Sequence, residues 1–241
     1  ALTLLLVTDT VSARNNTIRE AFPDVFSELP AEFDAGYKNP CWKTDGVTKC
    51  LPYYQILGVS KCGTTDLYSR MIAHPDIYDI KNKGPHWWDE DKKSGIATYL
   101  NLFSTAAKGI ESNRAGITGE ASSNTLSYSG VGIRGWRHAA PEARGILLPE
   151  LLREALPNQR NIVILRNPID RLYSSFYYYR DWRARGPPRE GEFEEEVNRV
   201  LTHWGNCVAR HPEDHCARSL YFLTQQLNKG MYARWGRNPK P

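Results

Sequence analysis

The sequence predicts an α/β fold, a P-loop-like parallel sheet flanked by helices. Short apolar runs of strand length alternate with amphipathic stretches of helical spacing, as in folds built on a parallel sheet. The run Tyr53–Leu57 leads directly into a loop with two glycines, Gly58–Thr65. A second run, Asn161–Leu165, is almost entirely apolar, which is typical of strands inside a parallel sheet. A chain of 241 residues can bury a substantial core in one domain.

The elements are expected in the following order. Residues 1–50, interrupted by three prolines, should form an irregular N-terminal extension, and residues 51–241 the main domain. Strands are predicted at Tyr53–Leu57, Ile77–Ile80, Ile117–Glu120 and Asn161–Leu165. Helices are predicted after Thr65, along 96–110 as one amphipathic helix, at Pro149–Leu156, after Asn167 and along 193–204. Asn167 and Pro168 suit a helix cap and first helical residue. Residues 127–146 should form a loop.

Composition limits the classes of partner. Apolar residues make up 41% and charged residues 24% of the chain, as in an ordinary globular protein. A net charge of +4 suits an anionic ligand but lacks the concentrated basic character of a nucleic-acid binder, so no nucleic acid partner is expected. The apolar segment Leu2–Val7 is far shorter than the ~20 residues that span a bilayer. This segment could be the tail of a signal or anchor segment, whose membrane-spanning part is then expected outside this chain, or simply a strand. The sequence gives no signal of oligomeric state.

The five cysteines favour an oxidising compartment. Cys41 with Cys50 and Cys207 with Cys216 each frame a short polar loop, and we expect two local disulfides and a free thiol at Cys62. No pair has the spacing of a zinc site, and no group of histidines accompanies them, so a metal is not expected. A glycosylation sequon at Asn15 agrees with a secretory route.

The loop Gly58–Thr65 has the strand–loop–helix arrangement that presents backbone N–H groups to a phosphate. Its two glycines have P-loop separation, but Lys61 precedes the second glycine instead of following it. This departure argues against an ATPase with a magnesium site. A lysine inside the loop can still stabilise negative charge on a departing phosphate without any metal.

A second anion site is predicted after the last strand. Arg166 follows the strand at its carboxyl end, where open α/β sheets bind ligands, and Ser174 lies about two helical turns further on. Two such sites in one small domain indicate a ligand with phosphates at two separated positions. A 3′,5′-bisphosphorylated nucleotide has this character.

These stretches resemble the Golgi carbohydrate sulfotransferases. The segment Lys61–Tyr68 resembles their 5′-phosphosulfate loop, and Leu165–Ser174 resembles their 3′-phosphate site. Supporting stretches are Lys38–Trp42, Pro85–Trp88 and Gly119–Ser122. Within the family the likeness is greatest to the enzymes that add sulfate at the 6-hydroxyl of GalNAc 4-sulfate in chondroitin and dermatan sulfate.

The resemblance implies a sulfotransferase fold, an enzyme that transfers a sulfuryl group from 3′-phosphoadenosine 5′-phosphosulfate (PAPS) to a sugar hydroxyl, and no metal. It implies a glycosaminoglycan acceptor and a type II membrane protein in the Golgi lumen. The residues that it assigns to the 5′-phosphosulfate are Lys61, Cys62, Gly63, Thr64 and Thr65. Those that it assigns to the 3′-phosphate are Arg166 and Ser174, and Lys61, Glu120 and His86 would be catalytic.

The chain departs from the family pattern in two places. Related enzymes often carry their general base, a glutamate, two residues before His86, where this chain has Gly84. Glu120, His86, Asp89 or Glu90 could substitute, and we choose Glu120 because related enzymes also have glutamate there. The family also continues beyond the region of Tyr232, so we expect the C-terminal part of the family domain to be missing here.

Two other functions stay open. A homologue without turnover would bind nucleotide or glycan, and the glycine at position 84 and the expected lack of the C-terminal part of the family domain favour it. A P-loop kinase would require magnesium-dependent use of ATP. The position of Lys61 makes this the weakest of the three functional hypotheses.

Overall fold

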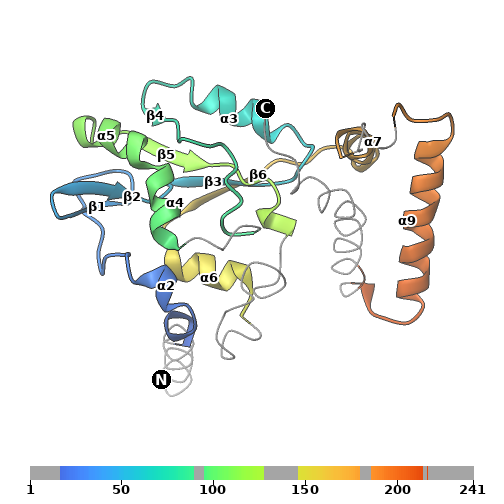
Figure 1. Cartoon of the computed structure of the whole chain (residues 1–241), viewed down its shortest axis with the longest axis horizontal. Coiled ribbons are helices and arrows are strands. Elements are labelled where there is room, and N and C mark those ends of the chain that lie inside the picture. The colour runs from blue at the N-terminus through green and yellow to red at the C-terminus, as the bar shows by residue number, and fades with distance from the viewer. Residues whose placement is uncertain (1–16, 90–94, 128–145, 180–185, 214–215, 217–241) are drawn as a thin grey trace, which may run out of the picture. The chain divides into compact units, whose positions relative to one another are not determined.

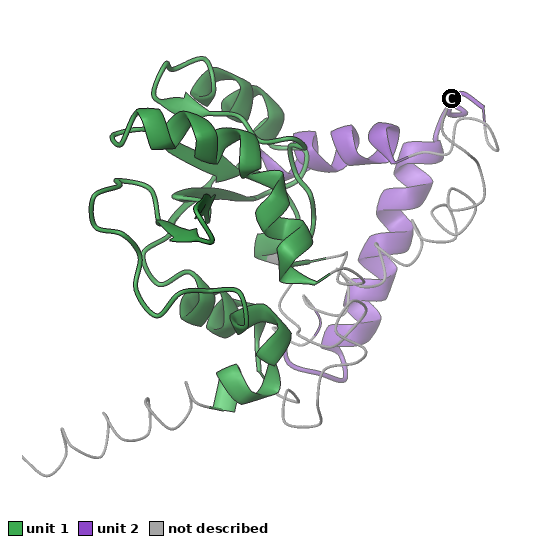
Figure 2. Ribbon diagram, turned by 60° about the vertical axis from the view of Figure 1, so that its left-hand side comes forward, with its two compact units in different colours: residues 1–165 green, residues 166–241 purple. Residues whose placement is uncertain are grey.

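The computed structural model describes residues 17–89, 95–127, 146–179, 186–213 and 216 (Figure 1). They belong to two compact units, residues 1–165 and 166–241 (Figure 2). The Leu2–Val7 segment, the Asn15 sequon, most of the predicted 127–146 loop and the chain beyond residue 216 lie outside the described residues. The predicted division at residue 50 stays a prediction.

The first unit contains a four-stranded parallel sheet with the strand order β4-β5-β3-β6. Its strands are β3 (Tyr54–Gly58), β4 (Ile77–Tyr78), β5 (Ile117–Glu120) and β6 (Arg160–Val163). All four lie within two residues of the predicted strand bounds. Because the strands are parallel, β3 and β5 have their carboxyl ends on the same side of the sheet, next to the loop that follows Gly58.

The position of β6 differs from the prediction. Its apolar run suggested a strand inside the sheet, but β6 is at an edge of the four described strands. Val163 is accordingly 44% exposed, and Asn161 is also exposed. An apolar run shows that a strand contacts a core, but its place in the sheet depends on which strands pair with it.

Helices lie on both sides of this sheet. In Figure 1, α3 (Thr64–Met71) lies above it and α6 (Leu148–Ala155) below it. The single helix predicted for 96–110 is wrong, because the chain forms α4 (Ile96–Leu102) and α5 (Ser104–Ser112). At Phe103 the N–H bonds to the carbonyl of Leu100, three residues back, which interrupts the α-helical pattern. The turn leaves Phe103 fully buried, so packing of this ring accompanies the break.

The N-terminal stretch is more regular than the sequence indicated. It contains α2 (Pro23–Phe26) and an antiparallel hairpin of β1 (Cys41–Thr44) and β2 (Val47–Cys50). Asp45 and Gly46 have positive φ angles of 52° and 76°, as a tight hairpin turn requires. The predicted disulfide Cys41–Cys50 joins the two ends of the hairpin and is confirmed.

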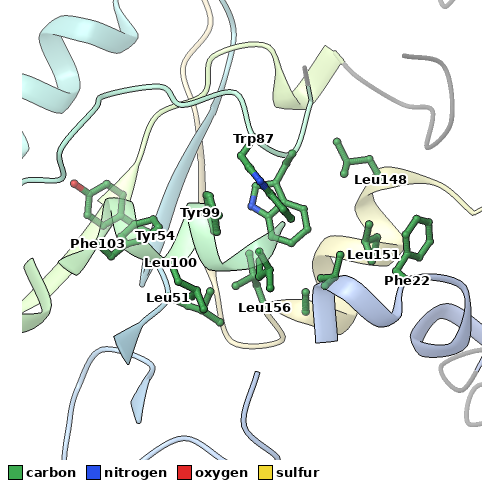
Figure 3. Close-up of a cluster of buried hydrophobic side chains, with 14 of the residues drawn as sticks. Phe22, Leu51, Tyr54, Trp87, Tyr99, Leu100, Phe103, Leu148, Leu151 and Leu156 are labelled. Carbon is green, nitrogen blue, oxygen red and sulfur yellow. The ribbon is translucent and has the colours of Figure 1, made fainter. Parts of the chain in front are cut away.

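Aromatic rings pack with leucine side chains in the core of the first unit (Figure 3). Trp87 stacks on Tyr99 with ring centroids 5.1 Å apart, and Trp88 meets the same ring edge-on at 5.5 Å. Phe22, from the stretch predicted to be an extension, is 1% exposed and belongs to this core. The buried Trp87 and Trp88 therefore hold the loop that carries His86 against the core.

The second unit contains α7 (Pro168–Tyr178) and α9 (Glu192–Val208). The predicted cap of α7 is confirmed, because the side chain of Asn167 accepts a hydrogen bond from the N–H of Ile169 at 2.9 Å. The predicted disulfide Cys207–Cys216 is also present, and Cys62 is a buried free cysteine as expected. Among the described helices, none combines the length and apolar character needed to cross a membrane.

Candidate active site

The loop after β3 has an unusual backbone. Lys61 has a φ angle of 69° and Gly63 of 93°, both in the left-handed region. Glycine reaches this region freely, whereas a lysine there is uncommon, and such residues gather at functional sites. The N–H of Val59 donates to the carbonyl of Ile164 at 3.0 Å, which ties the loop to the segment after β6. The N–H of Cys62 then donates to the carbonyl of Val59 at 3.0 Å and closes a turn.

Helix α3 starts where this loop ends. Gly63 is its N-cap, and Thr64 and Thr65 are its first two residues. The first N–H groups of a helix have no acceptor within the helix, and partial positive charge collects there. The loop residues assigned to an anion, from Lys61 to Thr65, thus surround a helix N-terminus that can hold one.

Lys83 also reaches this helix start. Its Nζ donates a hydrogen bond to Thr65 Oγ1 at 3.2 Å. Burial lowers the pKa of Lys83, and the negative charge of Glu120 acts in the opposite direction. Sequence reasoning missed this lysine, because no local pattern distinguishes it from Lys81 two residues earlier.

Glu120, at the end of β5, is the centre of a buried hydrogen-bond network. Its Oε1 accepts from Nε2 of Gln55, its register partner on β3. Its Oε2 accepts from the backbone N–H of Ser122 at 3.0 Å and from the Ser122 hydroxyl at 2.6 Å. The side chain is 0% exposed, and both oxygens of the carboxylate are occupied.

The surroundings of Glu120 favour its protonated form. Burial raises the pKa of Glu120 to about 7; the Ser122 hydrogen bond and the nearby His86 act against this, while the charge of Asp89 adds to it. Asp89 is also fully buried, so two carboxyl groups share this interior region. A carboxyl group poised near neutrality can exchange protons at working pH.

His86 connects this network to a second carboxylate. Its backbone N–H donates to the Ser122 hydroxyl at 2.9 Å, and its ring Nδ1 lies 2.9 Å from Oδ1 of Asp89. The other oxygen of Asp89 lies 3.2 Å from Oγ1 of Thr125, within hydrogen-bond distance. With the proton on Nδ1, the imidazole presents a basic nitrogen at Nε2, an arrangement suited to general base chemistry.

Gly84 lies beside that nitrogen. A Cβ atom at position 84 would be 3.7 Å from His86 Nε2 and 3.0 Å from the carbonyl oxygen of Ala121. The φ angle of Gly84 is +67°, a conformation that disfavours other residues. The glutamate that the resemblance leads us to expect at position 84 would therefore start next to the imidazole of His86, in a backbone conformation that favours glycine.

The predicted site residues fall into two groups. Lys61, Gly63, Thr65, His86 and Glu120 all belong to the first unit. Arg166 and Ser174 belong to the second unit, where Arg166 is exposed and Ser174, on α7, is half-buried. Their joint action with the loop stays a prediction.

Gln55 and Thr125 escaped sequence reasoning. A polar residue inside the otherwise apolar strand Tyr54–Gly58 was the one signal for Gln55.

In the part of the chain that the structure describes, no three His, Cys, Asp or Glu side chains are grouped to hold a metal ion.

The site geometry agrees with the comparison to protein families. The model of the sulfotransferase domain matches residues 53–230, most of the chain. The chain belongs to the sulfotransferase family. The α/β fold predicted from the sequence is thereby confirmed as a sulfotransferase fold, with the loop Gly58–Thr65 and the strand Arg160–Val163 inside the matched region.

Several curated sulfotransferases are similar to this family member. Carbohydrate sulfotransferase 15 of Homo sapiens is 31% identical over 77% of this chain, which corresponds to 37% of the human protein. The Rattus norvegicus protein of the same name is 26% identical over 95% of this chain and 54% of its own length. The membrane-associated sulfotransferase kil1 of Dictyostelium discoideum is 25% identical over 72% of this chain and 33% of its own length. The chain thus spans about a third to a half of these relatives.

A solved sulfotransferase structure, from Alicyclobacillus acidocaldarius, is also similar. It matches 71% of this chain and 64% of its own chain, with 22% identity and a TM-score of 0.41.

Proposed function

We propose that this protein transfers a sulfuryl group from PAPS to a carbohydrate hydroxyl. The observation that carries the proposal is the loop Gly58–Thr65, with Lys61 and Gly63 in left-handed backbone at the start of α3, in a chain of the sulfotransferase family. Such a loop offers N–H groups and a cation to a 5′-phosphosulfate.

The donor is held by two sets of residues in this proposal. Lys61, Gly63, Thr64 and Thr65, with the backbone of Cys62, bind the 5′-phosphosulfate. Arg166 and Ser174 bind the 3′-phosphate. Negative charge develops on the bridging oxygen as the sulfur–oxygen bond breaks, and the Lys61 ammonium stabilises it. This chemistry needs no metal ion.

The acceptor hydroxyl attacks sulfur in line with the departing phosphate. His86 takes the proton of that hydroxyl at Nε2, and adenosine 3′,5′-bisphosphate leaves. Two observations favour His86 over Glu120 as the base. Both oxygens of Glu120 accept hydrogen bonds in a fully buried position, whereas the His86 side chain is 29% exposed. Nε2 also lies beside the position where related enzymes carry glutamate.

Glu120 then acts as a positioning residue. It fixes the Ser122 hydroxyl, which in turn accepts from the backbone N–H of His86. Asp89 selects the tautomer of the imidazole and stabilises its protonated form after the proton moves.

For the acceptor we propose GalNAc 4-sulfate in chondroitin or dermatan sulfate, sulfated at its 6-hydroxyl. The similarity to carbohydrate sulfotransferase 15 and the stretches Pro85–Trp88 and Gly119–Ser122 support this choice. We also propose the Golgi lumen as the location, since the two disulfides need an oxidising compartment.

The test combines binding and turnover. Calorimetric titration with adenosine 3′,5′-bisphosphate should show saturable binding that Lys61→Ala and Arg166→Ala both weaken, while Lys81→Ala, which changes an exposed lysine bonded to Asn101, leaves it unchanged. Transfer of labelled sulfate from PAPS to chondroitin sulfate should be lost in Lys61→Ala. Near-normal turnover in that variant would reject the proposal. Binding without any turnover by the natural chain would favour a nucleotide-binding homologue, which the glycine at position 84 makes the second candidate.

A further inference from the structure

We propose that Lys83 is a second cation for the 5′-phosphosulfate, acting together with Lys61 from a different loop. The inference rests on the proposed donor and names a residue that contacts it.

The geometry places Lys83 at the anion-binding end of α3. Its Nζ lies 3.2 Å from the hydroxyl of Thr65, the second residue of that helix. Lys83 comes from the segment between β4 and His86, and Lys61 from the loop after β3. Lys61 precedes the N-cap of α3 by two residues, and Lys83 contacts its second residue from another segment. Both lysines therefore belong to a helix N-terminus, which favours an anion.

Lys83 lacks an ion pair among the described residues, and the negative charge of Glu120 opposes the effect of its burial without cancelling it. Lys43 and Lys49 each reach a carboxylate at 2.7 Å, those of Glu111 and Glu28. Lys83 forms no such ion pair within the described ranges, although it is half-buried. Withdrawing a charge from water costs free energy unless another charge compensates it, and the lowered pKa of Lys83 reflects that cost. A bound phosphosulfate would supply the missing negative charge.

The ammonium also has donors to spare. It carries three hydrogens, and one of them is engaged by Thr65. In the described part of the chain the other two have no hydrogen-bond acceptor. An ammonium is a compact charge that suits the oxygens of phosphate and sulfate groups. The hydrogen bond to Thr65 thus orients Lys83 without using up its capacity to bind an anion.

The experiment compares Lys83→Met with Lys81→Met. Lys81 lies two residues earlier, is exposed, and donates to Asn101 at 3.1 Å, so its replacement removes one positive charge away from the helix start. Each variant is titrated with adenosine 3′,5′-bisphosphate and with adenosine 3′-phosphate, which lacks the 5′ group. Thermal unfolding of each variant reports whether the fold is kept, and Lys83→Arg tests whether a cation of another shape restores binding.

Lys83→Met should weaken binding of the bisphosphate by about tenfold or more, as loss of a charge-assisted hydrogen bond does, with the unfolding temperature unchanged. Binding of adenosine 3′-phosphate and all binding by Lys81→Met should match the natural chain, and Lys83→Arg should recover part of the loss. Equal binding by Lys83→Met and Lys81→Met overturns the inference while the proposed function stands. A natural chain that binds no bisphosphate overturns both.

Discussion

The imidazole Nδ1 of His86 lies 2.9 Å from Oδ1 of Asp89, a carboxylate with no exposed surface. The two residues are three positions apart, and Trp87 and Trp88 between them are buried in the core. Packing of the tryptophans therefore fixes the loop in which the histidine meets the carboxylate. This pair can hold one tautomer of His86 and stabilise the imidazolium formed by proton transfer.

Asp89→Asn should lower kcat while leaving nucleotide binding intact. The amide keeps the size of the carboxylate but removes the negative charge that stabilises protonated His86. We expect kcat to fall by roughly 100-fold or more, within the usual range for loss of general base catalysis. Steady-state kinetics and calorimetry with adenosine 3′,5′-bisphosphate separate the two effects. An unchanged kcat would mean that another group takes the proton.

Glu120→Gln should destabilise the fold. Three donors, from Gln55 and from the backbone and hydroxyl of Ser122, converge on the two oxygens of Glu120. Above about pH 7, where Glu120 is ionised, both of its oxygens accept, whereas a glutamine has one oxygen and its NH₂ group must face a donor. A buried unsatisfied group costs about 1–3 kcal/mol. Urea unfolding measures this loss. The control is Glu111→Gln, which weakens a surface ion pair with Lys43 and should cost clearly less than Glu120→Gln, because solvent screens exposed charges.

Stability should depend on pH through the same carboxyl group. Burial raises the pKa of Glu120 from 4.5 to about 7, so between these values the folded protein keeps a proton that the unfolded chain has released. The contribution of Glu120 to the free energy of unfolding is thus complete below pH 4.5 and is lost as the pH rises to about 7. The slope is at most about 1.4 kcal/mol per pH unit. Urea unfolding at several pH values in this window measures the slope, and Glu120→Gln should flatten it. An equal slope in both proteins would assign the effect to other groups.

Gly84→Ala should cost more than Gly46→Ala. Both glycines have similar positive φ angles, 67° and 76°. An alanine should therefore cause a similar backbone strain at each position, about 1 kcal/mol. A Cβ at position 84 would also lie 3.0 Å from the carbonyl oxygen of Ala121, whereas position 46 has open space around it. The difference in unfolding free energy between the variants isolates this contact.

For the same reason Gly84→Glu should not increase sulfate transfer. The new side chain would start in a strained backbone, 3.0 Å from the carbonyl oxygen of Ala121 and 3.7 Å from His86 Nε2. A rise in kcat in this variant would show instead that the chain tolerates the family base and lacks only that residue.

Local sequence patterns determined the strands of the sheet and the glycine-containing loop after β3. The cap at Asn167, the glycines of the loop and the two short-range disulfides each depend on a few neighbouring residues, and all are present as expected. The strands were placed to within two residues because their apolar runs end at polar residues or turns. Such features can be predicted because the chain needs no distant partner to form them.

Tertiary structure decided the order of the described strands and the contacts of the predicted site residues. Among the described strands β6 is at an edge because β3 pairs with one of its sides and no described strand pairs with the other, which its own apolar run does not reveal. The helix predicted along 96–110 breaks at Phe103, whose ring is buried in the core. Glu120 was predicted as the base from its position in the sequence. Its partner Gln55 comes from another strand, and their register on neighbouring strands determines that both oxygens of the carboxylate are occupied.

The sequence by itself therefore determined that this protein has an α/β fold, a glycine-containing loop between β3 and α3, and two disulfides. Only the tertiary structure joined His86 to a buried Asp89 and brought Lys83 to Thr65. The reason is physical. Helix caps, turns and strand runs arise from interactions among neighbours, whereas burial, pKa and the pairing of charges depend on segments that meet only when the core forms.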